Sequence, residues 1–321
     1  MKIGQVNRIL VICRLNSIGD MLLTTPAVRT LKMAFPRAHL TYITKDHVKD
    51  VLFNNPDIDE LLIYDSGTLR RVASQLEYDL AINLFGGTKS GTICLVSGAK
   101  YRVGPKHMRV GHLNAYNAYI DHSGAGDIIA QFLSFTKTLG LKDASRETNL
   151  VLTSDENNFA ESFWQSSGIT GAKRIIGLHP GGDDPKKLWA AKNYALLADK
   201  LIADSGYNIL IFQGPGEEKI ANSVCLEMQE QAVLVPLLKL REYAALVNKC
   251  HLLITSDGGP LHLAAALGSN LIGIFCKDTD PDYWFPYGDK PGCRHLRESS
   301  PGNLPVAEVL TLARKLIAHL E

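Results

Sequence analysis

The sequence predicts an α/β protein made of two Rossmann-like domains whose parallel sheets face each other across a cleft. Short apolar runs rich in β-branched residues alternate with amphipathic stretches, a pattern typical of βαβ units. This alternation occurs twice, and a chain of 321 residues is long enough for two domains. A polar region, residues 142–149 continued by residues 153–158, separates the two series. Clefts of this kind hold nucleotides in many unrelated proteins.

In the first half, five apolar runs are predicted as strands joined by amphipathic stretches. The first run, "RILVIC", has the composition of a strand that is buried on both faces. A helical stretch, residues 127–141, closes this series. The predicted strands are residues 8–13, 39–44, 60–64, 79–84 and 101–104.

The second half repeats the pattern and ends in a predicted helix, residues 305–320, with one apolar face. We place the first domain at residues 1–165 and the second at residues 166–304. The strands of the second domain are predicted within residues 173–180, 207–215, 232–236, 250–260 and 270–275.

Cysteine usage and hydropathy limit the compartment. The cysteines are scattered and no two form a C-x-x-C pair, which favours reduced core thiols over disulfides or a zinc site. We therefore expect a cytoplasmic protein. The amino terminus has too short an apolar stretch for a signal peptide, and no run reaches the length of a transmembrane helix. The cysteines are Cys13, Cys94, Cys225, Cys250, Cys276 and Cys293.

Charge is unevenly distributed, with a net +5 in residues 1–150 and −4 in residues 151–321. Basic residues gather in "KYRVGPKHMRVGH", residues 100–112. Such a cluster suits contact with an anionic acceptor or a membrane surface, and it equally suits a solvated loop. Both interpretations stay open, and we expect no nucleic-acid partner.

The strongest binding signal is "LLITSDGGPLHLAAALG", residues 252–268. A strand, a turn with two glycines and a helix follow one another, and Pro260 suits the first helical position. The free N–H groups at such a helix start are suited to a phosphate. His262, in the first turn, can add a donor to the same anion. A purely structural turn is the alternative.

Two more strand ends carry polar loops. In "HPGGDDPKKLW", residues 179–189, Lys186 or Lys187 can neutralise a departing diphosphate, while the other is a surface charge. In "FQGPGEE", Glu217 or Glu218 can accept hydrogen bonds from ribose hydroxyls, or either can simply start a helix.

The stretch "RLNSIGDMLLTTPAV", residues 14–28, is a strand-to-helix loop with one carboxylate, Asp20. Asp20 either caps the helix and complements its dipole or lies in a ligand site at the end of a parallel strand. The "DTD" of residues 278–280 suggests a divalent cation, but lysines and helix starts can supply the same charge, so we expect no metal. Neither a Walker loop nor G-x-G-x-x-G follows the first strand, which disfavours ATPases and dehydrogenases.

Taken together, these motifs resemble the lipopolysaccharide heptosyltransferases, glycosyltransferase family 9. "SIGDMLLTTPAVRTLK", "HPGGDDPKKLW", "GPGE" and "SDGGPLHLAAALG" followed by "DTDPDYWFPYG" occur in the family's order over nearly the whole chain. The resemblance implies a GT-B fold, with the acceptor on the first domain and ADP-heptose on the second. It implies a carboxy-terminal helix, residues 305–321, that packs back on the first domain. It also implies inverting transfer, without a metal or other cofactor, at the cytoplasmic face of the inner membrane.

The resemblance assigns roles to particular residues. Asp20 is implied as the general base and Lys187 as a contact of the donor diphosphate, with Glu217 near the adenosine ribose. Asn83 stands where the family often has an aspartate. The implied donor-binding residues are Gly181, Gly182, Glu217, Asp257, Gly258, Gly259 and His262, and the acceptor-side candidates are Ser17, Lys89 and Arg109.

Two other functions fit the same architecture. A nucleotide-sugar epimerase shares the two-domain fold, but Asp20 has no evident second acid or base beside it in the first domain. A non-catalytic protein that binds a sugar nucleotide is the other alternative.

Overall fold

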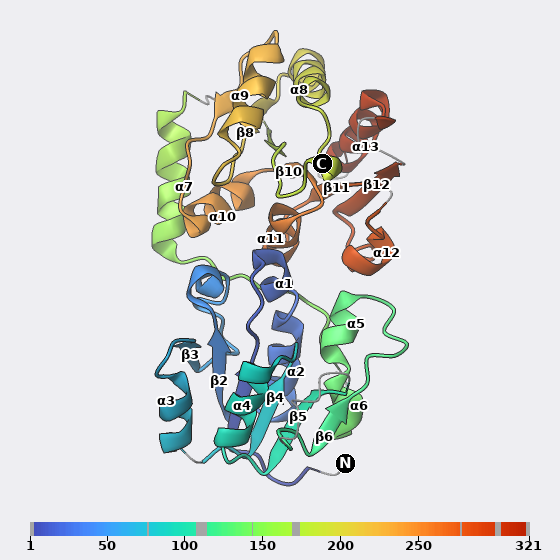
Figure 1. The fold of residues 1–321 in the computed structure, drawn as a ribbon. Helices are drawn as coiled ribbons and strands as arrows, with labels where there is room; N and C mark the ends of the chain where they lie inside the picture. Colours follow the sequence, from blue (N-terminus) through green and yellow to red (C-terminus); the bar gives the residue numbers. More distant parts are fainter. Residues whose placement is uncertain are drawn as a thin grey trace. The chain divides into compact units, whose positions relative to one another are not determined.

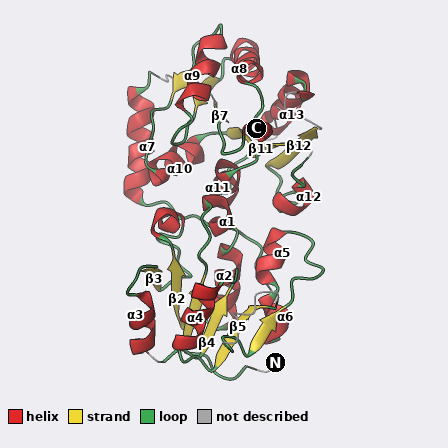
Figure 2. Ribbon diagram, in the orientation of Figure 1, coloured by secondary structure: helices red, strands yellow, loops and turns green. Residues whose placement is uncertain are grey.

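A computed structural model shows two compact units, Met1–Val151 and Leu152–Glu321, each built around a six-stranded parallel sheet (Figure 1). Helices alternate with strands in both units (Figure 2). The structure describes residues 3–75, 77–106, 114–142, 144–168, 174–276, 278–298 and 303–318.

The first unit carries strands β1 to β6 and helices α1 to α6. Its strands are β1 Arg8–Ile12, β2 His39–Thr44, β3 Glu60–Ile63, β4 Leu80–Asn83, β5 Tyr101–Pro105 and β6 Ala118–Ile120. Its helices are α1 Ile18–Leu22, α2 Thr25–Ala34, α3 Thr68–Gln75, α4 Thr88–Val96, α5 Ile128–Leu133 and α6 Phe135–Leu139, with a 3₁₀ helix at Asp46–Val51.

The second unit carries strands β7 to β12 and helices α7 to α13. Its strands are β7 Ile175–His179, β8 Asn208–Ile211, β9 Val233–Leu234, β10 Leu252–Ser256, β11 Leu271–Cys276 and β12 Cys293–Glu298. Its helices are α7 Ser154–Ser166, α8 Ala191–Ser205, α9 Glu218–Glu227, α10 Leu240–Lys249, α11 Gly259–Leu267, α12 Pro281–Trp284 and α13 Val306–Ala318, with a 3₁₀ turn at Pro185–Lys187.

Both sheets have the same doubly wound topology. The strand orders are β3-β2-β1-β4-β5-β6 and β9-β8-β7-β10-β11-β12, with parallel pairing throughout. In each sheet the chain winds outward from a central strand and then returns to its other side. The reversal falls between β1 and β4 in the first unit and between β7 and β10 in the second. Ligands of doubly wound sheets bind outside the carboxyl ends of the strands at this point.

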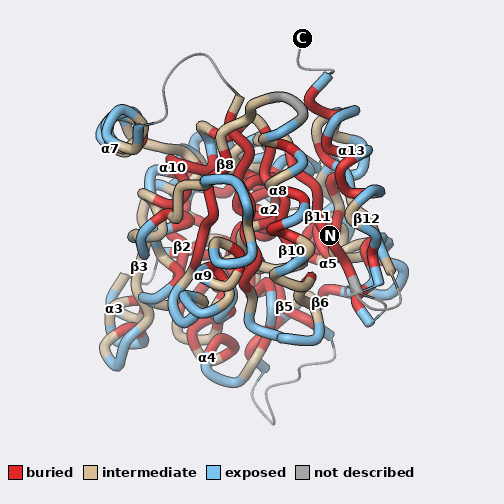
Figure 3. The backbone as a smooth tube through the Cα atoms, turned by 90° about the horizontal axis from the view of Figure 1, so that it is seen from above, coloured by how far each residue is buried: buried red, intermediate tan, exposed pale blue. Residues whose placement is uncertain are grey.

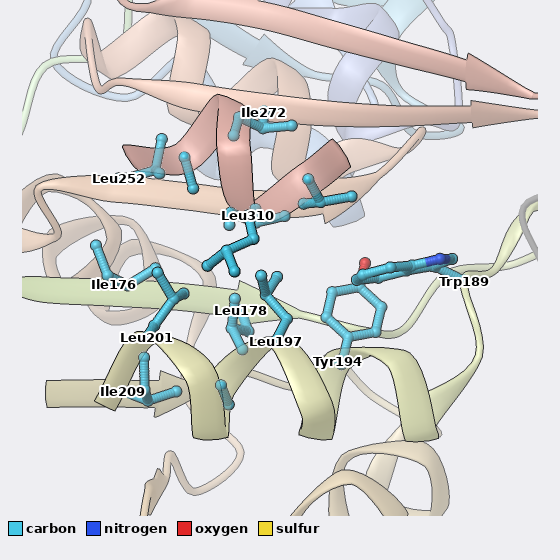
Figure 4. Packing of buried hydrophobic residues seen from close by; sticks show 14 of the residues in the cluster. Ile176, Leu178, Trp189, Tyr194, Leu197, Leu201, Ile209, Leu252, Ile272 and Leu310 are labelled. Carbon is cyan, nitrogen blue, oxygen red and sulfur yellow. The ribbon is translucent and has the colours of Figure 1, made fainter. Parts of the chain in front are cut away.

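The second unit is held together by one large apolar cluster in which α8 and α13 cover the sheet (Figure 4). Leu178 of β7 and Leu197 of α8 lie in it, as does Leu310 of α13. The Trp189 indole packs edge-on against the Tyr194 ring, with centroids 5.0 Å apart, and donates a hydrogen bond to the Leu304 carbonyl at 3.0 Å. This packing fixes the segment that carries the lysines just before α8.

The structure corrects the predicted domain boundary after residue 165. Helix α7 lies within the second unit, where it packs against α10. Two ion pairs join these helices, Glu156 with Arg241 and Glu161 with Lys249. The boundary therefore falls before α7, at Val151. The amphipathic pattern of α7 shows that one face is covered, but it does not show which domain covers it.

The carboxy-terminal helix α13 packs within the second unit, and its packing on the first domain stays a prediction. Buried and exposed residues alternate along α13 (Figure 3). Its apolar side chains, among them Val309, Leu310 and Ala313, belong to the core of the second unit. These side chains are buried there against α8 and the sheet.

Most predicted strands agree with the structure to within a few residues, but β6 and β12 were not predicted. Both are edge strands, and an edge strand with a single neighbour needs no continuous apolar run. Strand β12, "CRHLRE", has only two separated apolar residues, Cys293 and Leu296, and so shows no apolar run. The helical stretch 127–141 forms two short helices, α5 and α6, which meet at Ser134.

The cysteines with described side chains are free thiols, as predicted from their spacing: Cys13, Cys94, Cys225, Cys250 and Cys293. Burial raises the pKa of Cys13 to about 12 and raises the pKa of Cys94 and Cys250 further, so these thiols stay protonated. In the part of the chain that the structure describes, we find no helix with the length and apolarity needed to cross a membrane.

Candidate functional site

The loops that follow β7 and β10 begin side by side, because the two strands end next to each other in the second sheet. The two strands pair in register, with His179 opposite Thr255 at their ends. Tyr194 of α8 is buried behind these ends, and its hydroxyl lies 3.3 Å from the His179 carbonyl oxygen and 3.4 Å from Ser256 Oγ. The loops with the candidate donor-binding residues therefore start from a rigid base at the reversal point of the sheet.

The turn after β10 leaves space in front of helix α11. Gly258 precedes the helix, no side chain caps it, and Pro260 stands at its start. The backbone of Gly258 is extended, and a Cβ added there would meet only Pro260 Cδ, at 3.8 Å. Neither conformation nor packing within the described chain therefore requires glycine at 258. The missing side chain leaves the first N–H groups of α11, which begins at Gly259, open to an anion.

Lys187, not Lys186, reaches this turn. Lys187 Nζ lies 2.7 Å from Asp257 Oδ2, and the Asp257 side chain is only 9% exposed. The ion pair joins the loop after β7 to the loop after β10. Lys186 is exposed, and its backbone N–H donates to Asp184 Oδ1 at 3.0 Å. The sequence could not choose between the two lysines, and the structure places Lys187 beside the candidate phosphate site.

His262 lies buried in the first turn of α11 and is neutral. Its Nδ1 is 2.9 Å from the Tyr287 hydroxyl. Burial is the main cause that lowers the pKa of His262 from 6.5 to about 4; Asp257 opposes the shift and Lys187 adds to it. A histidine in this state cannot bring a positive charge to an anion, but a neutral imidazole still offers one N–H donor.

Glu217 lies between the loops after β7 and β8. Its Oε2 accepts a hydrogen bond from the Gly214 N–H at 2.5 Å and lies 3.0 Å from His179 Nε2. Burial alone raises the pKa of Glu217, but the His179 hydrogen bond and charge, with the Gly214 N–H, lower it below its usual value. A Cβ on Gly181 would overlap the Glu217 carboxylate, so a larger residue there would displace this carboxylate. Gly182 follows in the same loop, half-buried.

The first unit presents Asp20 in the first turn of α1. The helix is capped by Ser17, whose Oγ accepts a hydrogen bond from the Asp20 N–H at 3.3 Å. Asp20 is therefore not the capping residue, although a first-turn carboxylate still complements the helix dipole. Lys45 donates to the Asn16 side chain, and His47 Nε2 lies 3.2 Å from the Asn16 carbonyl oxygen. These bonds brace the loop that carries half-buried Asp20.

The neighbouring strand β4 ends at Asn83, whose side chain is used structurally. Asn83 Nδ2 donates to the Tyr116 hydroxyl at 2.6 Å, and its Oδ1 accepts from the Gly86 N–H at 2.9 Å. An aspartate here would have no N–H to donate. Lys89 is exposed in the first turn of α4, which follows this loop.

Of the basic cluster at residues 100–112, only the first part can be placed. Arg102 donates to the carbonyl oxygens of Ala99 and Ala115, so its guanidinium holds the local fold. Arg109, an acceptor-side candidate, lies outside the described residues. The structure therefore brings Ser17 and Lys89 to adjacent strand ends of the first sheet and leaves Arg109 unassigned.

The acidic pair at residues 278–280 has a structural role in part. Asp280 caps α12 by accepting a hydrogen bond from the Asp282 N–H at 3.2 Å, and it lies 3.9 Å from Arg297 Nη1. Over the described ranges, no three histidine, cysteine, aspartate or glutamate side chains gather closely enough to hold a metal ion.

Sequence reasoning missed His179, Tyr194, Tyr243 and Tyr287, which position the candidate residues. Each is an ordinary strand-end, helix or turn residue in the sequence, and its role depends on a partner far along the chain. The signal that could have found His179 is its place at the end of a buried strand, in "GLHPGG", where a polar side chain needs a partner.

Two doubly wound units in tandem, with glycine-containing loops at the reversal point of the second, are the architecture of the GT-B fold. The sequence profile of glycosyltransferase family 9 (heptosyltransferase) matches residues 67–303. The chain belongs to this family and is an enzyme.

Individual relatives agree with the family. The chain is 28% identical to lipooligosaccharide heptosyltransferase 2 of Haemophilus influenzae over 85% of its own length and 84% of the relative. Its fold is similar to a family 9 glycosyl transferase from Veillonella parvula, with a TM-score of 0.88, 22% identity and 99% of both chains covered. It is also similar to the ADP-heptose lps heptosyltransferase II of E. coli, with a TM-score of 0.80, 22% identity and coverage of 97% and 99%.

We expect the stability of the protein to fall between pH 6.5 and about 4 because of His262. The unfolded chain binds a proton in this range that folded His262 does not, so stability is present above pH 6.5 and is lost as the pH falls. One such group changes the free energy of unfolding by at most about 1.4 kcal/mol per pH unit. Urea unfolding at about pH 7 and about pH 4.5 should show a smaller loss for His262→Gln than for wild type.

The matched control is Tyr287→Phe, which removes the hydroxyl beside His262 but keeps the buried imidazole. It should keep the pH dependence of wild type, because burial is the main cause of the shift. An identical pH dependence in wild type and His262→Gln would contradict the assignment.

Proposed function

We propose that this enzyme transfers a heptose or a related sugar from an ADP-sugar to a hydroxyl of a lipopolysaccharide core acceptor, with inversion and without a metal. The observation that carries the proposal is the Lys187–Asp257 ion pair beside the uncapped start of α11. The names of the similar E. coli and Haemophilus influenzae proteins support the donor and the acceptor class.

Lys187 and the loop from Asp257 to His262 stabilise the leaving ADP in this proposal. Negative charge on the diphosphate grows as the bond to the sugar breaks, so a fixed cation stabilises the transition state more than the ground state. Before the donor binds, Asp257 holds Lys187 in place at 2.7 Å. The N–H groups at the start of α11 add donors that need no reorganisation.

Asp20 is the proposed general base. Inversion requires the acceptor hydroxyl to attack from the face opposite the leaving group, and a base must remove its proton as it attacks. A half-buried carboxylate on a braced loop at the carboxyl end of a central strand suits this task. Ser17, Lys89 and Arg109 are proposed to contact the acceptor, which carries anionic groups in our proposal.

A lipopolysaccharide acceptor would bring the enzyme to a membrane surface. We therefore propose a peripheral contact of the first unit, which is the more basic half of the chain, with the cytoplasmic face of the inner membrane.

Asp20→Asn should lower transfer by about 10²- to 10⁴-fold, the usual contribution of a general base, and leave the Kd for ADP unchanged. Release of ADP from ADP-heptose in the presence of a lipopolysaccharide core acceptor measures the first, and calorimetric titration measures the second. Glu77→Gln is the control, because this exposed carboxylate precedes β4 at the amino-terminal end of the strands, away from Asp20. Retained turnover in Asp20→Asn would rule out the base. Sugar isomerisation without acceptor would point to an epimerase instead.

Lys187→Ala should weaken ADP binding by about tenfold or more and slow turnover, because it removes a charge-assisted contact. Lys186→Ala is the matched control, since the neighbouring lysine is exposed and should change neither quantity. Full activity in Lys187→Ala, or a larger loss in Lys186→Ala, would overturn the role given to Lys187.

Gly258→Ala should leave the free energy of unfolding within about 0.5 kcal/mol of wild type, because the chain has room for the added methyl group. The same methyl group fills the space in front of α11, so the Kd for ADP should rise about tenfold. Gly126→Ala, in an open loop of the first unit, is the control and should change neither. Unchanged ADP affinity in Gly258→Ala would place the diphosphate elsewhere.

A further inference from the structure

A chain of three polar side chains runs from α10 to the loop before α9. The Tyr243 hydroxyl lies 3.0 Å from His179 Nδ1, and His179 Nε2 lies 3.0 Å from Glu217 Oε2. Tyr243 and His179 are buried, and the Glu217 side chain is 17% exposed. This row of three side chains therefore links the protein interior to a carboxylate that a ligand can reach.

The groups at the two ends have fixed protonation states. Burial and the negative charge of Glu217 raise the pKa of Tyr243, so the phenol keeps its proton. The lowered pKa of Glu217 keeps this carboxyl ionised, and it can only accept. His179 Nε2 is the ring nitrogen that faces this acceptor, 3.0 Å from Glu217 Oε2. The Tyr243 hydroxyl contacts the opposite ring nitrogen, Nδ1, at 3.0 Å and so holds the imidazole from its other side.

The surrounding loops are shaped to this carboxylate. A Cβ on Gly181 would overlap it, and a Cβ on Gly214 would lie 3.0 Å from Oε2. The Gly214 N–H and His179 Nε2 both approach Oε2. Among the contacts of the described residues, the Gly214 hydrogen bond and the His179 contact thus both go to one oxygen. The other oxygen, Oε1, keeps its lone pairs for a donor from outside the chain.

We propose that His179 and Tyr243 are positioning residues that fix Glu217 so that Oε1 accepts hydrogen bonds from the ribose hydroxyls of the donor. This inference rests on the proposed function, in which ADP-sugar is the donor and Glu217 is next to its ribose. His179 and Tyr243 do not touch the nucleotide. They remove the rotational freedom of Glu217 before binding, and preorganisation of this kind increases affinity.

The test compares ADP with 2′,3′-dideoxy-ADP, which lacks the ribose hydroxyls, by calorimetric titration of the full chain. Wild type should bind ADP at least about tenfold more tightly than the dideoxy analogue, because the analogue loses a hydrogen bond to a charged group. His179→Ala and Tyr243→Phe should lose most of this preference while their affinity for the dideoxy analogue stays unchanged. His179→Gln should regain part of it, since the amide can donate to Glu217.

Tyr194→Phe is the matched control, because its hydroxyl contacts the His179 carbonyl oxygen and Ser256 rather than the imidazole. It should keep the preference for ADP. Tyr243→Phe keeps the ring packed against Phe212, so it tests the inference even where His179→Ala does not fold.

The outcomes separate the inference from the proposed function. Equal loss of affinity for both ligands, or a full preference for ADP in the variants, would overturn the positioning role and leave the ribose contact standing. No preference for ADP in wild type would remove the ribose contact itself, and the positioning role with it.

Discussion

Parallel pairing of β7 with β10, in register up to His179 and Thr255, is the constraint on which the candidate site depends. These strands are neighbours in the sheet but are separated by more than 70 residues of chain, and His179 stands opposite Thr255. Because both strands end at one level, the loop with Lys187 and the loop with Asp257 emerge side by side. Their ion pair at 2.7 Å is a consequence of sheet register and not of local sequence.

The same constraint explains why so many buried polar groups lie near the ends of these strands. Strand ends expose main-chain groups and polar side chains that need partners once they are covered. Tyr194, Tyr243 and Glu217 supply them from three different helices or helix starts. The result is a rigid frame, and rigid support is what an electrostatic site requires, since its groups must be oriented before charge develops.

Much of the fold could be predicted from the sequence, because buried parallel strands leave an unmistakable apolar run. The prediction for residues 39–44 matches β2, whereas edge strand β12 carries charges and was missed. The domain boundary was predicted on the far side of helix α7 for a related reason. An amphipathic pattern specifies a buried face, but the surface that covers it depends on long-range packing.

The candidate site divides along the same line. Loops with Asp257, Gly258 and Lys187 could be found because glycine, lysine and a strand-to-helix turn are contiguous in the sequence. The links from Glu217 to His179 and Tyr243 could not, since they join β7, α9 and α10 only in the folded protein. The choice between Lys186 and Lys187 belongs to this second group, because it depends on which side chain reaches Asp257.

Two glycines of the site show how structural and ligand-related requirements can be separated. At Gly181 a side chain would displace the Glu217 carboxylate, which occupies the space where a Cβ would stand. At Gly258 the chain imposes no such limit, since the backbone is extended and a Cβ would meet only Pro260 Cδ, at an ordinary contact distance of 3.8 Å. A glycine that the fold does not need, placed before an uncapped helix and beside a paired lysine, is better explained by a ligand. The first glycine leaves room for a carboxylate, and the second leaves room before α11, where we propose that the diphosphate binds.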